Sequence, residues 1–323
     1  MRDQISLNAH PRERGYEMNA QMKHFTDDEI KKLVTLDEAK VAVKRAFEMW
    51  AEEKASTTQR SRASAGGMMC STMVAVVPPF SGGKIYSTNK GVFRFINVLF
   101  DQDGQFLCTL DGDQITRLRT AATVDIAFDL LSPKMVSRGS LLGAGRQSVM
   151  ILHTMLRKFH DIQISIYDPR DGAVENLIAE FSEYKSQMFN AESSADAVGE
   201  ADLIVTATSS PTPLFDISNI KMSALICAVG ATKAGLCEVD PSVVESAGAV
   251  ICDDVVGSKI ECGDLIEASL QGKFSWDRAL QFRDVLVGRQ IVEHGKGPIL
   301  FETQGVAIQD VAISSFIWQK SQE

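Results

Sequence analysis

The residues of this 323-residue chain that most clearly suggest chemistry form a glycine-rich turn. The six positions of this turn are Gly143, Ala144, Gly145, Arg146, Gln147 and Ser148. It lies between the strand-like segment SRGSLL and the helix-like segment RQSVMILHTMLRK. The first glycine permits a tight turn, the second lets the backbone approach a pyrophosphate, and the helix start supplies free N–H groups. The pattern therefore predicts a dinucleotide site, with the small Ser148 where a third glycine is usual.

An acidic residue follows this turn at the distance that suits a ribose. Asp168 ends the next predicted strand, 25 residues after Gly143, where an acid can accept a hydrogen bond from the ribose 2′-hydroxyl of NAD. Arg170 could instead pair with the 2′-phosphate of NADP, or could be a solvated charge at a helix start. Because Asp168 would repel that phosphate, we expect NAD(H) to be favoured, with NADP(H) as the alternative.

Other cofactor contacts are expected where neighbouring strands of the same sheet end. Ligands of open parallel sheets bind beyond the carboxyl ends of the strands. The positions that this rule and the motifs below select are Thr120, Thr206, Ala207, Thr208, Val229, Gly230 and Ala231.

The elements that must position these residues fall into two kinds. From residue 131 to 303, apolar strand-like runs alternate with helical segments such as AVENLIAEFSEY, which predicts an α/β domain with a doubly wound parallel sheet. From 21 to 130, a capping box at Thr35–Glu38 starts a helix, and short runs between Met68 and Leu110 predict antiparallel strands. The segment VAIQDVAISSFIWQK predicts a final helix that returns to this first part, and residues 1–20 predict a loose arm.

Composition limits the class of protein. The net charge of −9 and the pI near 5.2 argue against nucleic-acid binding, and no run of apolar residues is long enough to predict a membrane span. The first residues contain no apolar signal core, so we expect a cytoplasmic protein. Six cysteines without a C-x-x-C pair are expected to be reduced and mostly buried, and the five histidines lack metal-ligand spacing.

A candidate substrate site ends the first part of the chain. Arg119 lies in the segment Thr116–Ala122 among small residues, and its planar guanidinium could bind a carboxylate through two hydrogen bonds. Equally, it could be an arginine at a helix start that pairs with Asp111 or Asp113. The spacing alone leaves both interpretations open.

Six motifs taken together resemble one family. The runs LDGDQITRLRTAAT, LLGAGRQS, ADLIVTATSS, AVGATKAGLCEVDP, ECGD and TQGVAIQD, in this order, resemble the ornithine cyclodeaminase/mu-crystallin family from about Phe25 onward. The resemblance implies a homodimer of subunits with an NAD(P)-binding Rossmann domain, residues 131–303. It also implies a split α+β domain for substrate binding and dimerisation, residues 21–130 plus 304–323. The family acts on small α-amino or α-imino acids.

The resemblance also assigns site residues. It implies that Arg119 binds the substrate carboxylate, that Lys84 in GGKIYS is the active-site lysine, and that Thr303 contacts substrate. The second arginine of the family matches Arg62 by its spacing to Pro78, with Arg60 as a competitor.

A lysine crowded by arginines would have a lowered pKa and could donate a proton to an imine nitrogen. Without the resemblance, Lys84 would be read as a surface lysine at a strand edge. Asp310 matches a family aspartate that organises the site, although as an isolated residue it could be a helix cap.

Two departures from the family pattern bear on the reaction. Reductase and mu-crystallin-like members of the family often carry an aspartate five positions after the glycine that matches Gly230, where this chain has Gly235. Cyclodeaminases of the family carry an aspartate directly after that glycine, where this chain has Ala231. Without this acid, we expect reduction of a preformed cyclic imine, best Δ1-pyrroline-2-carboxylate to L-proline. The alternatives are an alanine-type dehydrogenase, then ornithine cyclodeaminase, and a non-catalytic, mu-crystallin-like binding protein.

Overall fold

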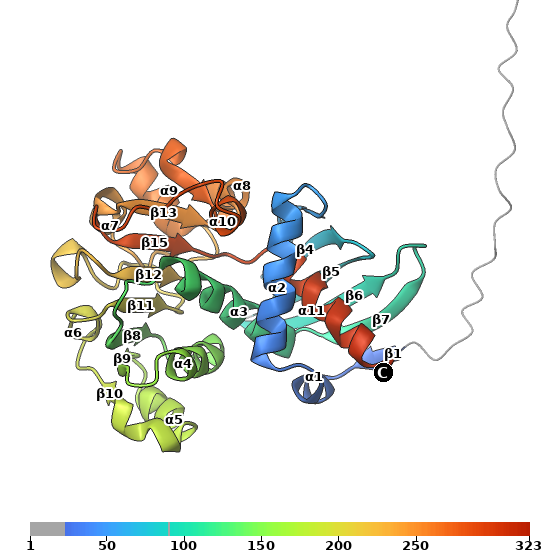
Figure 1. Ribbon diagram of the computed structural model, residues 1–323, viewed down its shortest axis with the longest axis horizontal. Helices are drawn as coiled ribbons and strands as arrows, with labels where there is room; N and C mark the ends of the chain where they lie inside the picture. Colours follow the sequence, from blue (N-terminus) through green and yellow to red (C-terminus); the bar gives the residue numbers. More distant parts are fainter. Residues whose placement is uncertain (1–22, 90) are drawn as a thin grey trace, which may run out of the picture.

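The computed structural model describes residues 23–89 and 91–323, which form two sheets that stand side by side (Figure 1). The predicted arm at residues 1–20 lies outside the described residues. The first sheet is antiparallel apart from one parallel pair, β1 with β7. Its strands are β1 (Lys23–Phe25), β2 (Ser56–Thr57), β3 (Ser61–Ala65), β4 (Met68–Val77), β5 (Phe80–Asn89), β6 (Val92–Phe100) and β7 (Phe106–Asp111).

Helices cover one face of this first sheet. The final helix α11 (Ala307–Lys320) packs on β4, β5 and β6, as its apolar pattern predicts. Beside it lie α1 (Asp27–Leu33) and α2 (Leu36–Ala51). The predicted capping box is present, because Glu38 N donates to Thr35 Oγ1 and Thr35 N donates to Glu38 Oε2.

The second sheet is parallel throughout, with the order β10-β9-β8-β11-β12-β15-β13-β14. Its strands are β8 (Arg138–Leu142), β9 (Gln163–Tyr167), β10 (Met188–Asn190), β11 (Leu203–Thr206), β12 (Leu225–Ala228), β13 (Ala249–Cys252), β14 (Ala279–Gln281) and β15 (Ile299–Glu302). The chain runs outward from β8 through β9 to β10, and then restarts on the other side of β8 with β11. This reversal of direction at β8 is where doubly wound sheets bind ligands.

Helices connect and flank these parallel strands. They are α3 (Asp113–Leu131), α4 (Arg146–Lys158), α5 (Ala173–Ala179), α6 (Ser194–Val198), α7 (Pro241–Ser246), α8 (Val255–Glu261), α9 (Gly263–Leu270) and α10 (Phe282–Leu286). Three short 3-10 turns complete the set, at Ser182–Gln187, Ile217–Asn219 and Trp276–Arg278. The predicted fold class, a Rossmann-type doubly wound sheet plus an α+β part, is confirmed.

Some details differ from the predicted elements. The segment AVENLIAEFSEY is a helix only to Ala179 and then tightens into the 3-10 turn at Ser182–Gln187. The strands β10, β14 and β15, of three or four residues each, were not among the predicted strands. Such short apolar runs give no periodicity to read.

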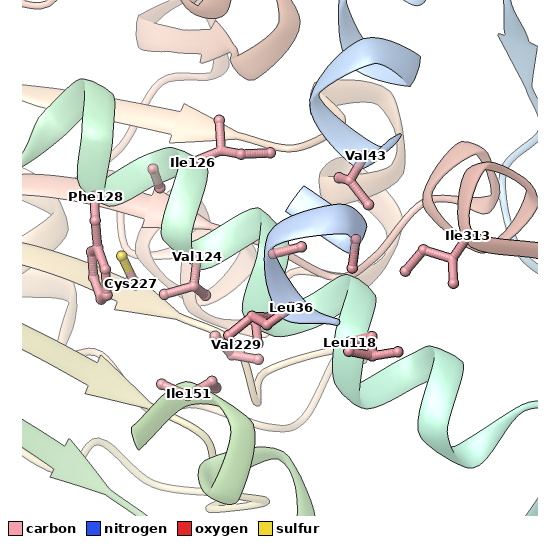
Figure 2. Packing of buried hydrophobic residues seen from close by; sticks show 14 of the residues in the cluster. Leu36, Val43, Leu118, Val124, Ile126, Phe128, Ile151, Cys227, Val229 and Ile313 are labelled. Carbon is pink, nitrogen blue, oxygen red and sulfur yellow. The ribbon is translucent and has the colours of Figure 1, made fainter. Parts of the chain in front are cut away.

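The helix α3 joins the two halves of the molecule. It is buried nearly all round and packs against α2, α4 and α11, which accounts for its apolar residues on every face. Figure 2 shows residues of this shared core from α2, α3, α4, α11 and the end of β12: Leu36, Val43, Leu118, Val124, Ile126, Phe128, Ile151, Cys227, Val229 and Ile313. One core therefore extends from the first sheet to the second, and the predicted domain limits stay a prediction.

Candidate functional site

The glycine-rich turn follows β8 as predicted. Gly143 has a φ of +100°, and a Cβ there would lie 2.7 Å from the carbonyl oxygen of Ala207. Ser148 Oγ donates to the Gly143 carbonyl at 2.7 Å and accepts from Gly145 N at 3.2 Å. Ser148 is small enough for this position, as predicted, and its hydroxyl also stabilises the turn through two hydrogen bonds.

The acid at the end of β9 is bound to this turn. Asp168 accepts hydrogen bonds from Ala144 N at 2.8 Å and from two guanidinium nitrogens of Arg170 at 2.8 and 2.7 Å. The hydrogen bond from Arg170 lowers the pKa of Asp168 to about 2, so the carboxylate is ionised. Asp168 and Arg170, the two residues expected near the cofactor ribose, therefore lie at the same edge of the turn. Most of the Arg170 side chain is exposed.

A cavity of about 670 Å³ opens at this edge, lined in part by Gly143, Gly145, Asp168 and Thr208. A Cβ at Gly145 would meet nothing within 4 Å, so the backbone there is open to a ligand. Gln147 Oε1 is buried beside the turn without a hydrogen-bond partner. Together with the N-terminus of the 13-residue α4, these features fit a nicotinamide dinucleotide.

The ends of β11 and β12 are held together by a residue that sequence reasoning missed. Glu238 accepts hydrogen bonds from the hydroxyls of Thr206 and Thr208 and from the backbone N–H groups of Thr208, Gly230 and Ala231. A Cβ at Gly230 would collide with the Thr208 backbone. The two segments predicted to contact the cofactor, at the ends of β11 and β12, are therefore linked by hydrogen bonds to Glu238. The motif CEVDP contained Glu238, but nothing in its spacing pointed to this role.

Lys84 lies on the covered face of β5, not at a sheet edge, and its side chain is 3% exposed. Its Nζ donates to Asp310 Oδ1 at 2.8 Å and lies 3.5 Å from Thr116 Oγ1. The ammonium also lies over the ring of Phe95, 5.7 Å from its centroid. The first sheet and α11 thus bury an ion pair between residues 226 positions apart.

Burial lowers the pKa of Lys84 to about 8. The Asp310 carboxylate opposes this shift, whereas the positive charges of Arg119 and Arg60 add to it. Asp310 Oδ2 is buried and has no hydrogen-bond partner. Lys84 can therefore bind or release a proton near neutral pH.

Arg119 lies in the middle of α3 rather than at its start, and is 9% exposed. Its Nη1 donates to Gln309 Oε1 at 3.4 Å, its Nε has no partner, and any side chain at Gly305 would collide with it. Asp113, an alternative partner, is 2.8 Å from Arg117. In the part of the chain that the structure describes, Arg119 forms no ion pair, so its guanidinium is available for an external carboxylate.

The two candidates for the second arginine lie in different surroundings. Arg60 is 6% exposed and donates to the carbonyls of residues 304 and 305, against which Arg119 also packs. Arg62 is 25% exposed and donates to the Thr232 carbonyl in the loop after β12. Glu261 pairs with both, at 2.7 Å from Arg60 and 2.5 Å from Arg62. Arg60 thus lies beside Arg119, whereas Arg62 is turned toward the outside.

Thr303 is hydrogen-bonded to another residue that the sequence did not reveal. Its hydroxyl donates to Asp253 Oδ2 at 2.7 Å, and Gly305 N donates to the same oxygen at 2.7 Å. Burial raises the pKa of Asp253, and these hydrogen bonds oppose that rise. Asp253 therefore anchors the 303–305 segment beneath the two arginines.

The remaining sequence expectations concern cysteines, metals and membranes. Five of the six cysteines are buried as free thiols, and Cys70 is exposed. Residues 23–89 and 91–323 hold no cluster of histidine, cysteine or acidic side chains suited to a metal ion. Within the same ranges, every helix is too short or too polar to cross a bilayer.

Comparison with known proteins gives a consistent set of relatives. The model of the ornithine cyclodeaminase/mu-crystallin family matches residues 22–323. Delta(1)-pyrroline-2-carboxylate reductase 2 of Burkholderia ambifaria is 30% identical over 210 residues, which span 65% of this chain and 64% of that enzyme. Alanine dehydrogenase of Archaeoglobus fulgidus is 25% identical over 92% of this chain and 94% of that protein. Iminosuccinate reductase of Paracoccus denitrificans is 27% identical over 90% and 94%.

Solved structures share the fold along nearly the whole chain. Thermococcus litoralis Delta(1)-pyrroline-2-carboxylate reductase, in complex with NADH and L-proline, superposes with a TM-score of 0.87 at 22% identity, over 93% of this chain and 98% of that one. An archaeal alanine dehydrogenase dimer with bound NAD gives 0.87 at 23% identity, over 93% and 96%. At this identity the likeness shows the fold alone.

Proposed function

This chain belongs to the ornithine cyclodeaminase/mu-crystallin family, and from that premise we propose that it is an NAD(H)-dependent oxidoreductase that reduces a cyclic α-imino acid. The favoured substrate is Δ1-pyrroline-2-carboxylate, with L-proline as product, the chemistry named for several relatives. NADP(H) is the alternative cofactor. The observation that carries the proposal is an unpaired buried guanidinium, Arg119, next to a buried lysine with a pKa of about 8.

In this proposal, the candidate site residues have different roles. Arg119 binds the substrate carboxylate, and we assign the supporting arginine to Arg60 because it shares the 304–305 carbonyl surface with Arg119. Lys84 donates the proton that the imine nitrogen needs, and Asp310 holds its ammonium in place. NADH, when bound on the glycine-rich turn, supplies the hydride for the imine carbon.

The count of buried charges favours a substrate with one carboxylate. Lys84 is paired with Asp310, and Arg60 with Glu261. Arg119 is left as the one buried cation of this group without a carboxylate among the described residues. A second substrate carboxylate, as in iminosuccinate, would have to displace Glu261 from its arginines, which favours a monocarboxylate.

The residues after β12 favour reduction over cyclodeamination. Ala231, at the position of the cyclodeaminase aspartate, is 1% exposed and presents only a methyl group. No carboxylate therefore stands where the family's cyclodeaminases are expected to have one. An alanine-type dehydrogenase remains the second candidate, because an open-chain imine would use the same cations.

The test is oxidation of NADH or NADPH, followed at 340 nm with cyclic imines, pyruvate plus ammonia, and ornithine. We expect turnover with NADH and cyclic imines. Turnover of ornithine with ammonia release and no net change in NADH would contradict the proposal. A protein that binds these ligands but turns over none would instead be a mu-crystallin-like binding protein.

The role of Arg119 can be tested in the same assay. Arg119→Ala is expected to lower kcat/KM about 100- to 1,000-fold, because a desolvated carboxylate loses its charged partner. The affinity for NADH should stay nearly unchanged. The matched control is Arg45→Ala, an exposed arginine on α2. Equal losses of turnover and NADH affinity in the Arg119 variant would mean that this arginine is structural.

We also propose that the protein is a homodimer joined through the outer face of its first sheet. Six apolar side chains that are 40% exposed or more project from β4, β5 and β6 on the face opposite α11: Met68, Val74, Val76, Ile85, Val92 and Ile96. Exposed apolar areas of this kind mark interaction sites. A second copy is the fitting occupant, because a relative with the same fold is a dimer. A cytoplasmic location stays a prediction from the sequence.

A further inference from the structure

Glu238 is a fully buried acid for which the reaction described above has no use. Both of its oxygens accept backbone hydrogen bonds: Oε1 from Thr208 N at 2.6 Å, and Oε2 from Gly230 N at 2.7 Å and Ala231 N at 3.1 Å. The hydroxyls of Thr206 and Thr208 add contacts at 2.8 and 2.7 Å. This is the hydrogen-bond pattern of an ionised carboxylate, which only accepts.

These hydrogen bonds fix the backbone that borders the cofactor cavity. Thr208 lines the cavity, and its methyl group would lie 3.1 Å from a Cβ at Gly143, so it contacts the glycine-rich turn. On its other side, Thr208 lies against Gly230 too closely for any side chain to fit at that position. Glu238 therefore sets the spacing between the ends of β11 and β12, at the carboxyl edge where a dinucleotide binds.

Two further buried acids lie close to Glu238. Asp264 Oδ1 accepts from Glu238 N at 2.6 Å, and its Oδ2 has no partner. Glu302 accepts only a long contact from Gln304 Nε2 at 3.4 Å, and its Oε1 has no partner. No lysine or arginine among the described residues forms an ion pair with any of these three acids, so the carboxyl group with the fewest donors should be protonated.

The pKa values agree with this division of charge. Burial and the nearby Asp264 raise the pKa of Glu302 well above its usual value. Burial, with Glu238 as the next cause, raises the pKa of Asp264 to about 7. Burial also raises the pKa of Glu238, but its hydrogen bonds from Thr208, Thr206 and Gly230 oppose the rise. The hydrogen-bond donors around Glu238 thus favour its charged form, and burial without such donors favours the neutral form of Glu302.

We propose that Glu238 is a positioning residue for the nicotinamide cofactor that also discriminates between its two redox states. Its carboxylate holds the strand ends at which the cofactor binds, and its uncompensated charge stabilises the oxidised form relative to the reduced form. The oxidised nicotinamide ring carries a positive charge that the reduced ring lacks, so a fixed negative charge in a dry interior acts on only one of them. This inference rests on the proposed function, and in that setting it favours hydride donation from NADH to the imine.

The test compares the dissociation constants of NAD⁺ and NADH for the purified protein without substrate, by protein fluorescence or calorimetry. Glu238→Gln removes the charge at nearly constant volume and should weaken NAD⁺ binding on the order of tenfold more than NADH binding. Glu302→Gln is the matched control, because it changes a neighbouring acid that carries no charge. It should leave the ratio of the two constants within about twofold of the wild-type ratio.

Equal weakening of NAD⁺ and NADH by Glu238→Gln would overturn the discrimination, and so would an equal shift of the ratio in the Glu302 control. If Glu238→Gln does not fold, the same two dissociation constants are measured for Glu238→Asp. With the charge kept and the hydrogen bonds displaced, both affinities should fall while their ratio stays within about twofold; a tenfold change in the ratio would overturn the inference. If the wild-type protein binds neither dinucleotide, it is the proposed function that fails.

Discussion

At the scale of single residues, the site depends on how its charges are paired. Among the described residues, Lys84 has a carboxylate partner and Arg119 has none, although both are buried within the same region. Burial, which outweighs the effect of Asp310 on the pKa of Lys84, lets the lysine exchange a proton near neutral pH, and the arginine is available for a substrate anion. The family resemblance selected both residues, but their different pairing could not be predicted from the sequence, because Asp310 lies 226 positions from Lys84.

The pH dependence of the reduction follows from Lys84. Proton donation requires the ammonium form, which is populated below a pKa of about 8, so kcat/KM should be constant at lower pH and fall as the pH rises through 8. Asp310 opposes the lowering of this pKa. In Asp310→Asn the falling limb should therefore move to lower pH, as measured in a pH–rate profile.

A surface acid provides the comparison for this profile. Asp113 pairs with Arg117 and Arg146, and it does not contact Lys84. Asp113→Asn should leave the limb near pH 8. A limb that stays in place in Asp310→Asn would show that another group donates the proton.

The sequence could not decide whether Arg60 or Arg62 is the second arginine of the site. The two residues are two positions apart, so an extended chain would place them on the same side, and spacing to Pro78 cannot separate them. Their contacts separate them, and those contacts come from Glu261, Thr232 and residues 304–305, at least 170 positions away. Such long-range partners leave no local pattern in a single sequence.

At the scale of elements, the sequence predicted the parts with strong local signals. The capping box at Thr35, the glycine-rich turn after β8 and the apolar pattern of α11 each depend on neighbouring residues, and each prediction agrees with the structure. The strand β15 was missed, although it lies inside the parallel sheet between β12 and β13. Its four residues, ILFE, show no periodicity, and the run was not recognised as a strand although the equally short β11, β12 and β13 were.

Two similar substitutions in the glycine-rich turn should differ in their effects on stability and on NADH affinity. Gly143→Ala should lower the free energy of unfolding by about 1–3 kcal/mol, because φ is +100° and the new methyl group would meet Ala207 O. Gly145→Ala should leave stability unchanged, because its methyl group would meet no protein atom within 4 Å. That methyl group would instead enter the space that a pyrophosphate approaches, so the affinity for NADH should fall.

Thermal unfolding and NADH titration of both variants would check this pair. Equal loss of stability in the two would contradict the open space around Gly145. Normal NADH affinity in Gly145→Ala would contradict the placement of the cofactor on this turn.

At the scale of the whole molecule, the exposed apolar face of the first sheet is the feature that a single subunit does not explain. Ile85 on β5 lies directly opposite Ile96 on β6, and both are at least 40% exposed. Ile85→Glu places a charge in the middle of this face and should convert the proposed dimer to a monomer, as measured by analytical ultracentrifugation.

The control for this experiment is Val41→Glu, an exposed apolar residue on α2. It should leave the assembly unchanged while adding the same charge. A dimer that persists in Ile85→Glu would place the interface elsewhere. A wild-type protein that sediments as a monomer would contradict the proposed homodimer.

The position of α11 in the chain has a consequence for biosynthesis. The strands β4 to β6 leave the ribosome long before this helix, since the whole parallel sheet, through β15, is translated between them. Domains emerge and fold in order during translation, but here the amino-terminal sheet lacks the helix that covers it and the carboxylate that pairs with Lys84. The half of the protein that is made first is thus the half that finishes folding last, and a ribosome stalled before residue 307 would display an uncovered sheet to the chaperones of the cell.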